Sequence, residues 1–233
     1  MIGLNTLNGE LVVYTSAPDC ESMIRNDWHV RLLPGGKAEF SRNISYYGGA
    51  YAARNRFFAN ITPDAERQFW EQQFSGLLTG AENKECSRDF KLYPGLVKLK
   101  FTVPDFWKQS GSFCYFTLPD SGSAGLIRTA GIRTLPCLVS GGAVRQERFT
   151  VEYPENWQYC QLNGSSCNFN LASRDKRVSQ SVALANGVLE LDFYFGLNGT
   201  LYVPVQGYSM LEAMQKFLSN PANRTFLFKT TGN

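Results

Sequence analysis

The chain contains one histidine, His29, in the segment 27–31. Nucleophilic catalysis by serine or cysteine usually needs a neighbouring base, most often histidine, and the sequence has no Gly-x-Ser-x-Gly turn to present a serine. Residues 35–37, Gly-Gly-Lys, lack the earlier glycine of a phosphate-binding loop and are typical of a turn between strands. We therefore predict that His29 is a hydrogen-bonded strand residue, and that the protein is neither a triad hydrolase nor a nucleotide enzyme.

Two carboxylates have the spacing that a glycosidase needs. Glu190 and Asp192 lie two residues apart in a predicted strand, which places both side chains on one face about 7 Å apart, and Tyr194 extends the row. Glycosidases use two carboxyl groups about 5 to 10 Å apart. The alternative is the solvent-exposed face of an antiparallel sheet. We predict this alternative and no catalytic residue, and keep a glycan-cleaving hydrolase as a third hypothesis.

The segment 46–58 combines tyrosines, arginines and glycines, and no acidic residue occurs from Ser41 to Pro63. Tyrosine supplies amphipathic contact area and arginine binds carboxylate, sulfate or phosphate, so both are common in binding hot spots. We predict a recognition loop here; the alternative is a strand pair whose aromatic side chains are core. A second acid-free segment, 121–146, also contains arginines. If the two segments share one side of the molecule, an acidic glycan or acidic protein surface would be the ligand.

A third candidate site is the segment 156–164, which places aromatic and amide side chains together. An aromatic ring can stack on a sugar while Asn and Gln bond its hydroxyls, although Trp157 is more often a core residue. The predicted ligand-binding residues of the two sites are Tyr46, Tyr47, Tyr51, Arg54, Arg56, Trp157, Tyr159 and Asn163. Nucleic acid is not expected as a partner, because the pI is about 8.5 and no nucleic-acid motif is present.

The six cysteines are an even set with no pair in the spacing of a zinc or iron–sulfur site, so we expect no metal and no cofactor. Cys160 and Cys167 enclose the turn-forming residues 161–166, and we predict a disulfide between them that fixes a surface loop. A disulfide that closes such a short loop stabilises the folded state by only about 2.5 kcal/mol. Cys114 and Cys137 could form a second bridge. The alternative is a set of reduced thiols in a cytosolic protein.

The sequence also indicates a compartment. Five N-glycosylation triplets occur where about two are expected by chance, which suggests exposed polar loops. Together with the predicted disulfide, they favour an extracellular or cell-surface protein, with periplasmic transit if the source is bacterial. No apolar run reaches the eighteen residues of a membrane helix, so we expect no transmembrane segment.

Alternation of apolar and polar residues predicts mainly strands, most clearly at 97–103 and 148–153. The Asn186-Gly187 pair between two apolar runs predicts a hairpin of 178–185 with 188–196, followed by a third strand at 200–206. In the second strand the odd-numbered residues would point inward, and Glu190, Asp192 and Tyr194 outward. Thr225–Thr230 is predicted as a closing strand, which under the surface-assembly alternative could be an exposed sheet edge.

Two helices are predicted within this β pattern. The first, at about 62–79, has Thr62 as its cap and an apolar stripe that includes Phe69 and Phe74. The second, at about 209–219, begins with a Ser209–Glu212 capping box. The expected fold class is therefore mainly β, an antiparallel β-sandwich-like domain with two peripheral α-helices.

The 233 residues, with 43% hydrophobic and 18% charged residues, exclude a disordered chain and allow about 72% of the surface to be buried. We predict a single β-rich domain over 1–233. The alternative is an N-terminal β domain at 1–118 and a C-terminal meander and helix domain at 146–233, joined by the irregular 119–145.

The leading functional hypothesis is an exported, disulfide-stabilised recognition domain, a cell-surface adhesin or receptor-binding protein for a glycan or protein ligand on another surface. Its loops would bind the ligand and its sheets would hold the loops. The alternative is a structural subunit of a surface or secretion assembly, which would pair with a partner chain through an exposed strand edge.

Overall fold

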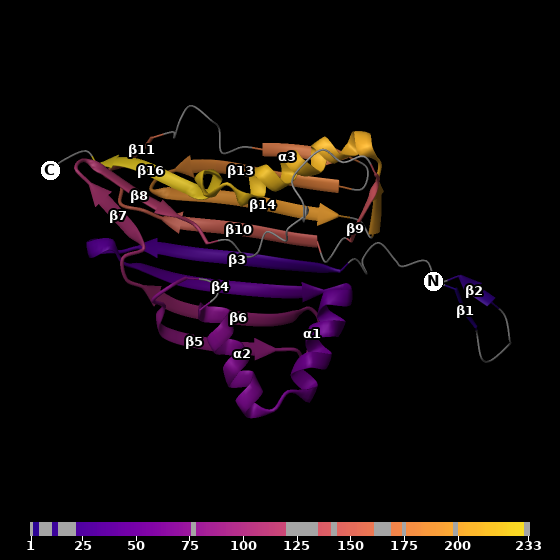
Figure 1. The fold of residues 1–233 in the computed structure, drawn as a ribbon. Helices are drawn as coiled ribbons and strands as arrows, with labels where there is room; N and C mark the ends of the chain where they lie inside the picture. Colours follow the sequence, from indigo (N-terminus) through magenta and orange to yellow (C-terminus); the bar gives the residue numbers. More distant parts are fainter. Residues whose placement is uncertain are drawn as a thin grey trace.

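The computed structural model describes residues 2–4, 11–13, 22–75, 78–119, 135–140, 144–160, 169–173, 176–197 and 200–230. Its largest element is a sheet of eight strands (Figure 1). In spatial order the strands are β12 (Phe169–Ser173), β13 (Lys176–Ala185), β14 (Val188–Leu197), β10 (Val144–Glu152), β3 (Met23–Leu32), β4 (Ala38–Tyr47), β6 (Gly95–Val103) and β5 (Glu82–Asp89). Strands that precede and follow the segment 119–145 therefore share one sheet.

Neighbouring strands of this sheet are antiparallel except for β3 and β10, which run parallel at its centre. The predicted hairpin is confirmed, because β13 and β14 pair through a two-residue turn. Both turn residues have positive φ, 50° at Asn186 and 75° at Gly187, as the hairpin signal requires. The turn between β3 and β4 is also confirmed, as the short 3-10 helix η2 (Pro34–Gly36).

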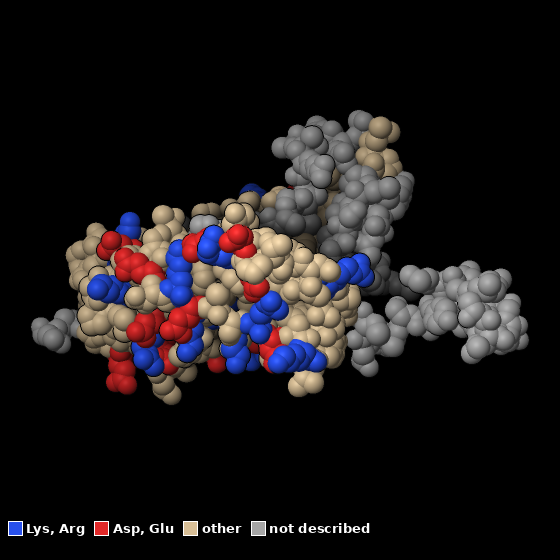
Figure 2. Space-filling model, turned by 90° about the horizontal axis from the view of Figure 1, so that it is seen from below, with Lys and Arg blue, Asp and Glu red and all other residues tan. Residues whose placement is uncertain are grey.

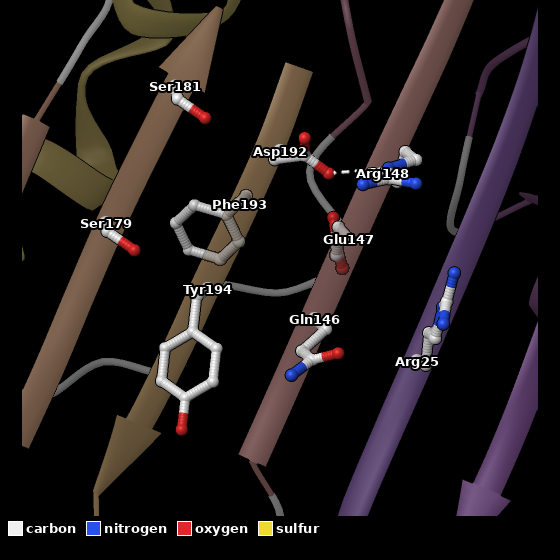
Figure 3. Close-up of a pocket in the computed structure, with 9 residues that line it drawn as sticks. All are labelled: Arg25, Gln146, Glu147, Arg148, Ser179, Ser181, Asp192, Phe193 and Tyr194. Carbon is white, nitrogen blue, oxygen red and sulfur yellow. Dashed lines mark hydrogen bonds and ion pairs between the residues drawn. The ribbon is translucent and has the colours of Figure 1, made fainter. Parts of the chain in front are cut away.

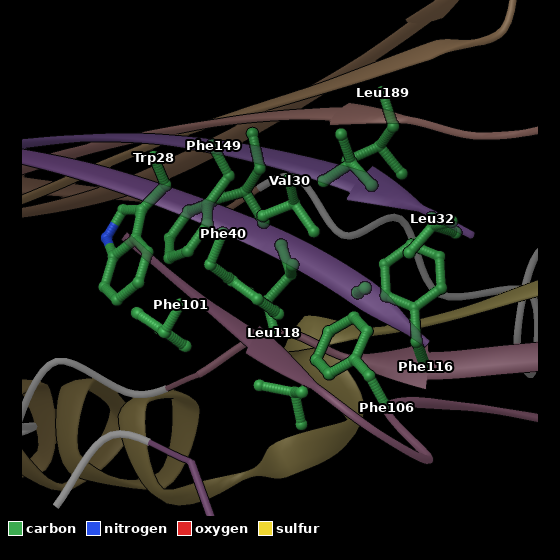
Figure 4. Packing of buried hydrophobic residues seen from close by; sticks show 14 of the residues in the cluster. Trp28, Val30, Leu32, Phe40, Phe101, Phe106, Phe116, Leu118, Phe149 and Leu189 are labelled. Carbon is green, nitrogen blue, oxygen red and sulfur yellow. The ribbon is translucent and has the colours of Figure 1, made fainter. Parts of the chain in front are cut away.

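Alternate residues of the large sheet point to a buried face, here called the core face. Its aromatic side chains stack in pairs: Trp28 lies 5.3 Å from Phe149 and Phe40 lies 5.0 Å from Phe101, measured between ring centroids (Figure 4). Aliphatic residues such as Val30 fill the space between the rings. The alternation predicted for 97–103 is confirmed, since its four odd-numbered residues are buried.

A second sheet covers part of the core face, which confirms the sandwich-like fold (Figure 1). Its order is β11 (Trp157–Cys160), β16 (Thr225–Thr230), β8 (Phe113–Thr117) and β7 (Trp107–Ser110). Phe116, Phe226 and Phe228 are its fully buried rings. The predicted strand at 225–230 is confirmed as β16, but it is not the exposed edge that the surface-assembly alternative would use, because β16 lies between β11 and β8 and bonds to both.

Three helices pack on the core face (Figure 1). α2 (Pro63–Ser75) and α3 (Tyr208–Ser219) confirm the two predicted helices, and Thr62 caps α2 by accepting a hydrogen bond from the backbone N–H of Ala65 at 3.3 Å. The predicted capping box of α3 is not formed, since that helix begins after Gly207 without a side-chain cap. α1 (Gly48–Asn60) occupies the segment predicted as a loop or strand pair.

Shorter elements complete the fold. These are β1 (Ile2–Leu4) paired with β2 (Leu11–Val13), β9 (Cys137–Ser140) paired with β15 (Thr200–Val203), and the 3-10 helices η4 (Val205–Gly207) and η5 (Pro221–Arg224). The predicted meander is therefore wrong in its third strand, because β15 pairs with β9 and not with β14. None of the described helices is long and apolar enough to cross a membrane.

The end of the molecule formed by β5 and α2 has a mixed charge. Acidic and basic side chains are interspersed on the surface seen from below (Figure 2). Arg88 of β5 pairs with Glu66 of α2, and Lys84 pairs with Glu71. Every residue of β5 is exposed. A charged edge strand of this kind is a common protection against pairing with other chains.

Candidate functional site

The residues that alternate with the core face form a second face of the eight-stranded sheet, here called the outer face. The strand registers arrange them in rows that cross seven strands from β13 to β5. The first row is Ser179, Tyr194, Gln146, Arg25, Ser45, Leu96 and Asp89, and the second is Ser181, Asp192, Arg148, Asp27, Asn43, Lys98 and Ser87. The third is Ala183, Glu190, Thr150, His29, Ser41, Lys100 and Glu85, and the fourth is Ala185, Val188, Glu152, Arg31, Glu39, Thr102 and Glu82. None of these side chains is buried.

The first two rows contain a shallow groove, here called the first groove, of about 740 Å³ of space open to solvent (Figure 3). It is lined by Arg25, Gln146, Glu147, Arg148, Ser179, Ser181, Asp192, Phe193 and Tyr194. The lining thus combines hydroxyl, amide, guanidinium and carboxylate groups with the partly exposed ring of Tyr194. These side chains come from β3, β10, β14 and β13, so no single segment of the chain builds the site.

Tyr194 lies along its strand because the next residue on the same face is a glycine. A Cβ atom on Gly196 would lie 2.9 Å from both Cε1 and the hydroxyl oxygen of Tyr194. Real Cβ atoms do not approach other atoms so closely, so only glycine leaves room for the ring in this position. Tyr194 therefore presents part of its ring at the surface of the groove.

The charges of the first groove are compensated within the protein. Arg148 donates to Asp192 with an Nε to Oδ1 distance of 2.7 Å, and Arg25 contacts Asp27 at 3.0 Å. The hydrogen bond from Arg148 to Asp192 raises the pKa of the guanidinium, and Glu190 and Asp27 add to this shift. The four rows together contain eight acidic and five basic residues. The outer face therefore carries no excess of positive charge for an anionic ligand.

A second groove, of about 770 Å³, lies in the third and fourth rows of the same face. It is lined by His29, Arg31, Glu39, Phe40, Ser41, Asn83, Glu85, Lys100, Phe101 and Thr102. His29 is an exposed residue of β3, which confirms its predicted place in a strand, and its Nε2 lies 3.0 Å from Oε1 of Glu152. Arg31 pairs with the same carboxylate at 2.9 Å.

The predicted tyrosine and arginine site is not a loop. Tyr46 is buried at the end of β4, whereas Tyr47 and Tyr51 are half-buried and pack against Tyr93 from the β5–β6 connection. Arg54 lies over three aromatic rings of β4, α1 and α2. Arg56 is exposed on α1.

Among the arginines of the acid-free segments 41–63 and 121–146, Arg42 cannot contribute to a basic surface, because it lies in the core with 6% of its surface exposed. Two of its nitrogens donate to Asn26 Oδ1 at 3.0 and 2.6 Å, and its guanidinium lies 4.5 Å from the ring centroid of Trp28. Burial lowers the pKa of Arg42 to about 10. Arg128 and Arg133 lie outside the described residues, and Arg145 is half-buried.

The described aromatic residues of the other predicted site, at 156–164, pack against the second sheet. Trp157 is buried in β11, where its ring contacts Trp107 and Phe228, so no ring face is free for a sugar. Tyr159 is half-buried and packs against the same sheet. Asn163 lies outside the described residues.

Only one of the two cysteines of the predicted disulfide, Cys160, lies in the described part of the chain. Cys160 is a free thiol whose sulfur lies 3.7 Å from the carbonyl oxygen of Gln158. Cys167 lies outside the described residues, so the pairing of the two stays a prediction. Cys114 is a free, buried thiol of β8. Its predicted partner Cys137 is in β9.

Glu190 and Asp192 share the outer face, as their spacing predicts. Glu190 is exposed and Asp192 is held by Arg148, so both carboxylates lie in contact with solvent rather than in an enclosed cleft. In the described part of the chain, no three His, Cys, Asp or Glu side chains are grouped so that they could hold a metal ion.

Most residues of the first groove have no local signal in the sequence. Tyr194 was predicted to point outward, but Gln146, Arg148, Ser179 and Arg25 were not singled out. Arg25 reaches Gln146 only because β3 pairs in parallel with β10, more than a hundred residues later in the chain. The one local signal was the Tyr-Phe-Gly sequence at 194–196, in which the glycine follows the tyrosine at a spacing of two. Comparison with family models, curated proteins and solved structures gives no significant match to this chain.

Proposed function

We propose that the protein is a recognition domain that binds an uncharged carbohydrate in the first groove. The observation that carries the proposal is the ring of Tyr194 lying along the strand over Gly196, within a row of hydrogen-bonding side chains. An aromatic ring packs against the apolar side of a sugar, and the hydroxyls around it need donors and acceptors. Gln146 and Ser179 directly flank Tyr194 on the neighbouring strands.

The charge of the face supports an uncharged ligand. Both arginines of the groove already face aspartates, and their ion pairs are about half exposed. An acidic glycan would have to displace Asp192 or Asp27 and would meet their repulsion. Neutral hydroxyls can instead accept from guanidinium N–H groups that these carboxylates leave available, since each arginine carries five donors.

We further propose that the protein acts outside the cytosol, on the surface of a cell or in the extracellular space. The excess of glycosylation triplets in the sequence supports this compartment. Asn43, the first of them, is exposed in the second row of the outer face. A glycan attached there would cover the groove region, so the proposal favours export without glycosylation at Asn43.

The other hypotheses have less support. A surface-assembly subunit was expected to offer the strand at 225–230 as a free edge, and that strand is internal. A hydrolase would place one of its two carboxyl groups in an apolar environment that keeps it protonated, whereas Glu190 is exposed. A protein ligand for the outer face remains the second candidate, because flat polar faces also bind proteins.

The test is affinity electrophoresis of the purified protein in gels that contain soluble polysaccharides, both neutral (glucan, mannan, xylan) and acidic (uronic acid or sulfated). We expect retardation by a neutral polymer, and a loss of about tenfold in affinity for Tyr194→Ala, because stacking contributes about 1.4 kcal/mol. Retardation should change little between low and moderate salt, since no ligand charge is screened.

The matched control is Tyr115→Ala. Tyr115 is a half-exposed tyrosine of β8 in the other sheet, and its removal should leave retardation unchanged. Circular dichroism verifies that each variant is folded. The proposal is wrong if folded wild-type protein binds no neutral polymer, or if Tyr194→Ala binds as well as wild type.

A further inference from the structure

We infer that the first and second grooves bind one extended polysaccharide chain that crosses the sheet diagonally. The inference rests on the proposed function and adds a second subsite and a ligand length to it. Both grooves lie on the outer face, and they meet at β3, which contributes Arg25 to the first and His29 and Arg31 to the second. No described residue between them on the outer face is an exposed bulky aromatic that would block the path.

The registers give the length of the path. The first groove is centred between β14 and β10 and the second between β4 and β6, three strands away. The second groove is also two rows further along the strands. With strands about 4.8 Å apart and a rise of about 3.4 Å per residue, the two centres are about 20 Å apart. A ligand that occupies both must therefore be longer than a disaccharide.

The second groove has the chemistry of a subsite that binds by hydrogen bonds alone. Ser41 and Thr102 offer hydroxyls, Asn83 an amide and Lys100 an ammonium group, and each is at least partly exposed. The groove has no exposed aromatic ring, because its two phenylalanines belong to the core face. Its contribution to affinity should therefore be smaller than that of Tyr194 and should depend on the first groove being filled.

The charges at the junction of the grooves also fit an uncharged chain. Arg31 contacts both Glu152 and Glu39, at 2.9 and 3.8 Å, and His29 contacts Glu152. These side chains are about half exposed, so their ion pairs contribute little to stability. Sugar hydroxyls can therefore take over some of these contacts without leaving a buried charge unpaired.

The test is isothermal titration with neutral oligosaccharide ladders (cello-, xylo- and manno-oligosaccharides of two, four, six and eight units) on wild type and three variants. Ser41→Trp fills the middle of the second groove, and Ser87→Trp places the same ring on the outer face of β5, outside both grooves. Lys100→Ala is a milder variant of the second groove that removes only an exposed ammonium group.

We expect affinity to rise about tenfold from the shortest to the longest bound oligomers, because a chain anchored in the first groove has a high effective concentration at the second. Ser41→Trp should remove this gain and leave the short oligomers unaffected, Lys100→Ala should reduce it, and Ser87→Trp should retain it. Equal affinity at all lengths with dependence on Tyr194 would overturn this inference and leave the proposed function intact. Absence of binding by any oligomer or polymer would overturn both.

Discussion

The two faces of the eight-stranded sheet are built from alternate residues of the same strands, yet they differ in almost every physical property. On β10, Phe149 and Val151 are buried, whereas the alternating residues Arg148 and Thr150 are exposed and half-buried, respectively. The core face is filled by stacked rings. The outer face carries polar rows and two grooves. Since the strands are shared, the difference shows how one set of backbone hydrogen bonds serves stability on one side and leaves the other side available for recognition.

Position in the pleat therefore decides what a substitution does. A core-face residue is surrounded on all sides, so its loss leaves a cavity. An outer-face residue has water on one side, so its loss changes the surface and leaves the fold in place. Substitutions of neighbouring residues that point to opposite faces of the sheet test this difference most directly.

The largest expected effect is that of Phe149→Ala on stability. The ring is 2% exposed and stacks on Trp28, so its removal should lower the free energy of unfolding by about 3–5 kcal/mol. Urea denaturation followed by tryptophan fluorescence measures the change. Thr150→Ala, one residue later and on the outer face, is the control and should cost less than about 0.5 kcal/mol. Similar costs for both would show that the two faces do not differ as the burial pattern indicates.

The next effect separates binding from stability on the outer face. Gly196→Ala places a methyl group where the Tyr194 ring lies, and the ring must move because its outer end is free to do so. We expect a loss of several-fold in carbohydrate affinity with a change of less than about 1 kcal/mol in the free energy of unfolding. Gly49→Ala is a control for glycine removal, since Gly49 does not have a positive φ and its Cβ position lies 3.4 Å from the nearest side chain, that of Ser22, an ordinary contact distance. A stability loss without a change in affinity would contradict the role given to Tyr194.

The elements that could be predicted from the sequence are those with local signals. Alternation predicted the strand that contains Val97 and Phe101, Asn186-Gly187 predicted the hairpin, and Thr62 predicted the start of α2. α1 was missed because its residues do not form an apolar stripe: only Phe58 of its thirteen residues is buried.

The site was harder to predict than the fold for a related reason. Tyr194 was correctly expected on the outer side of its strand, but its neighbours depend on long-range pairing. Gln146 and Arg25 meet across the parallel β3–β10 contact, which no short-range pattern specifies. Residues chosen for their type alone, such as Trp157 and Tyr46, proved to be buried, because aromatic rings are also good core material.

The smallest expected effect compares two arginine–carboxylate pairs on opposite faces. Arg88 and Glu66, at 2.6 Å on the side of α2, are 34% and 25% exposed, whereas Arg148 and Asp192 on the outer face are 53% and 47% exposed. Because the less exposed pair is less screened, Arg88→Ala should lower the free energy of unfolding by up to about 1 kcal/mol at pH 7 and Arg148→Ala by less than half of that.

The hydrogen bond from Arg88 lowers the pKa of Glu66 in the folded state, so the stabilisation that this pair contributes is present above the ordinary glutamate pKa. It is lost as the pH falls through the lowered value, when Glu66 takes up a proton. Urea denaturation of wild type and Arg88→Ala should therefore give different free energies of unfolding at pH 7 and converging ones as the pH falls well below the ordinary glutamate pKa. A difference that persists undiminished at low pH would assign the effect of Arg88 to its packing over the Phe58 ring, 4.7 Å away, rather than to its charge.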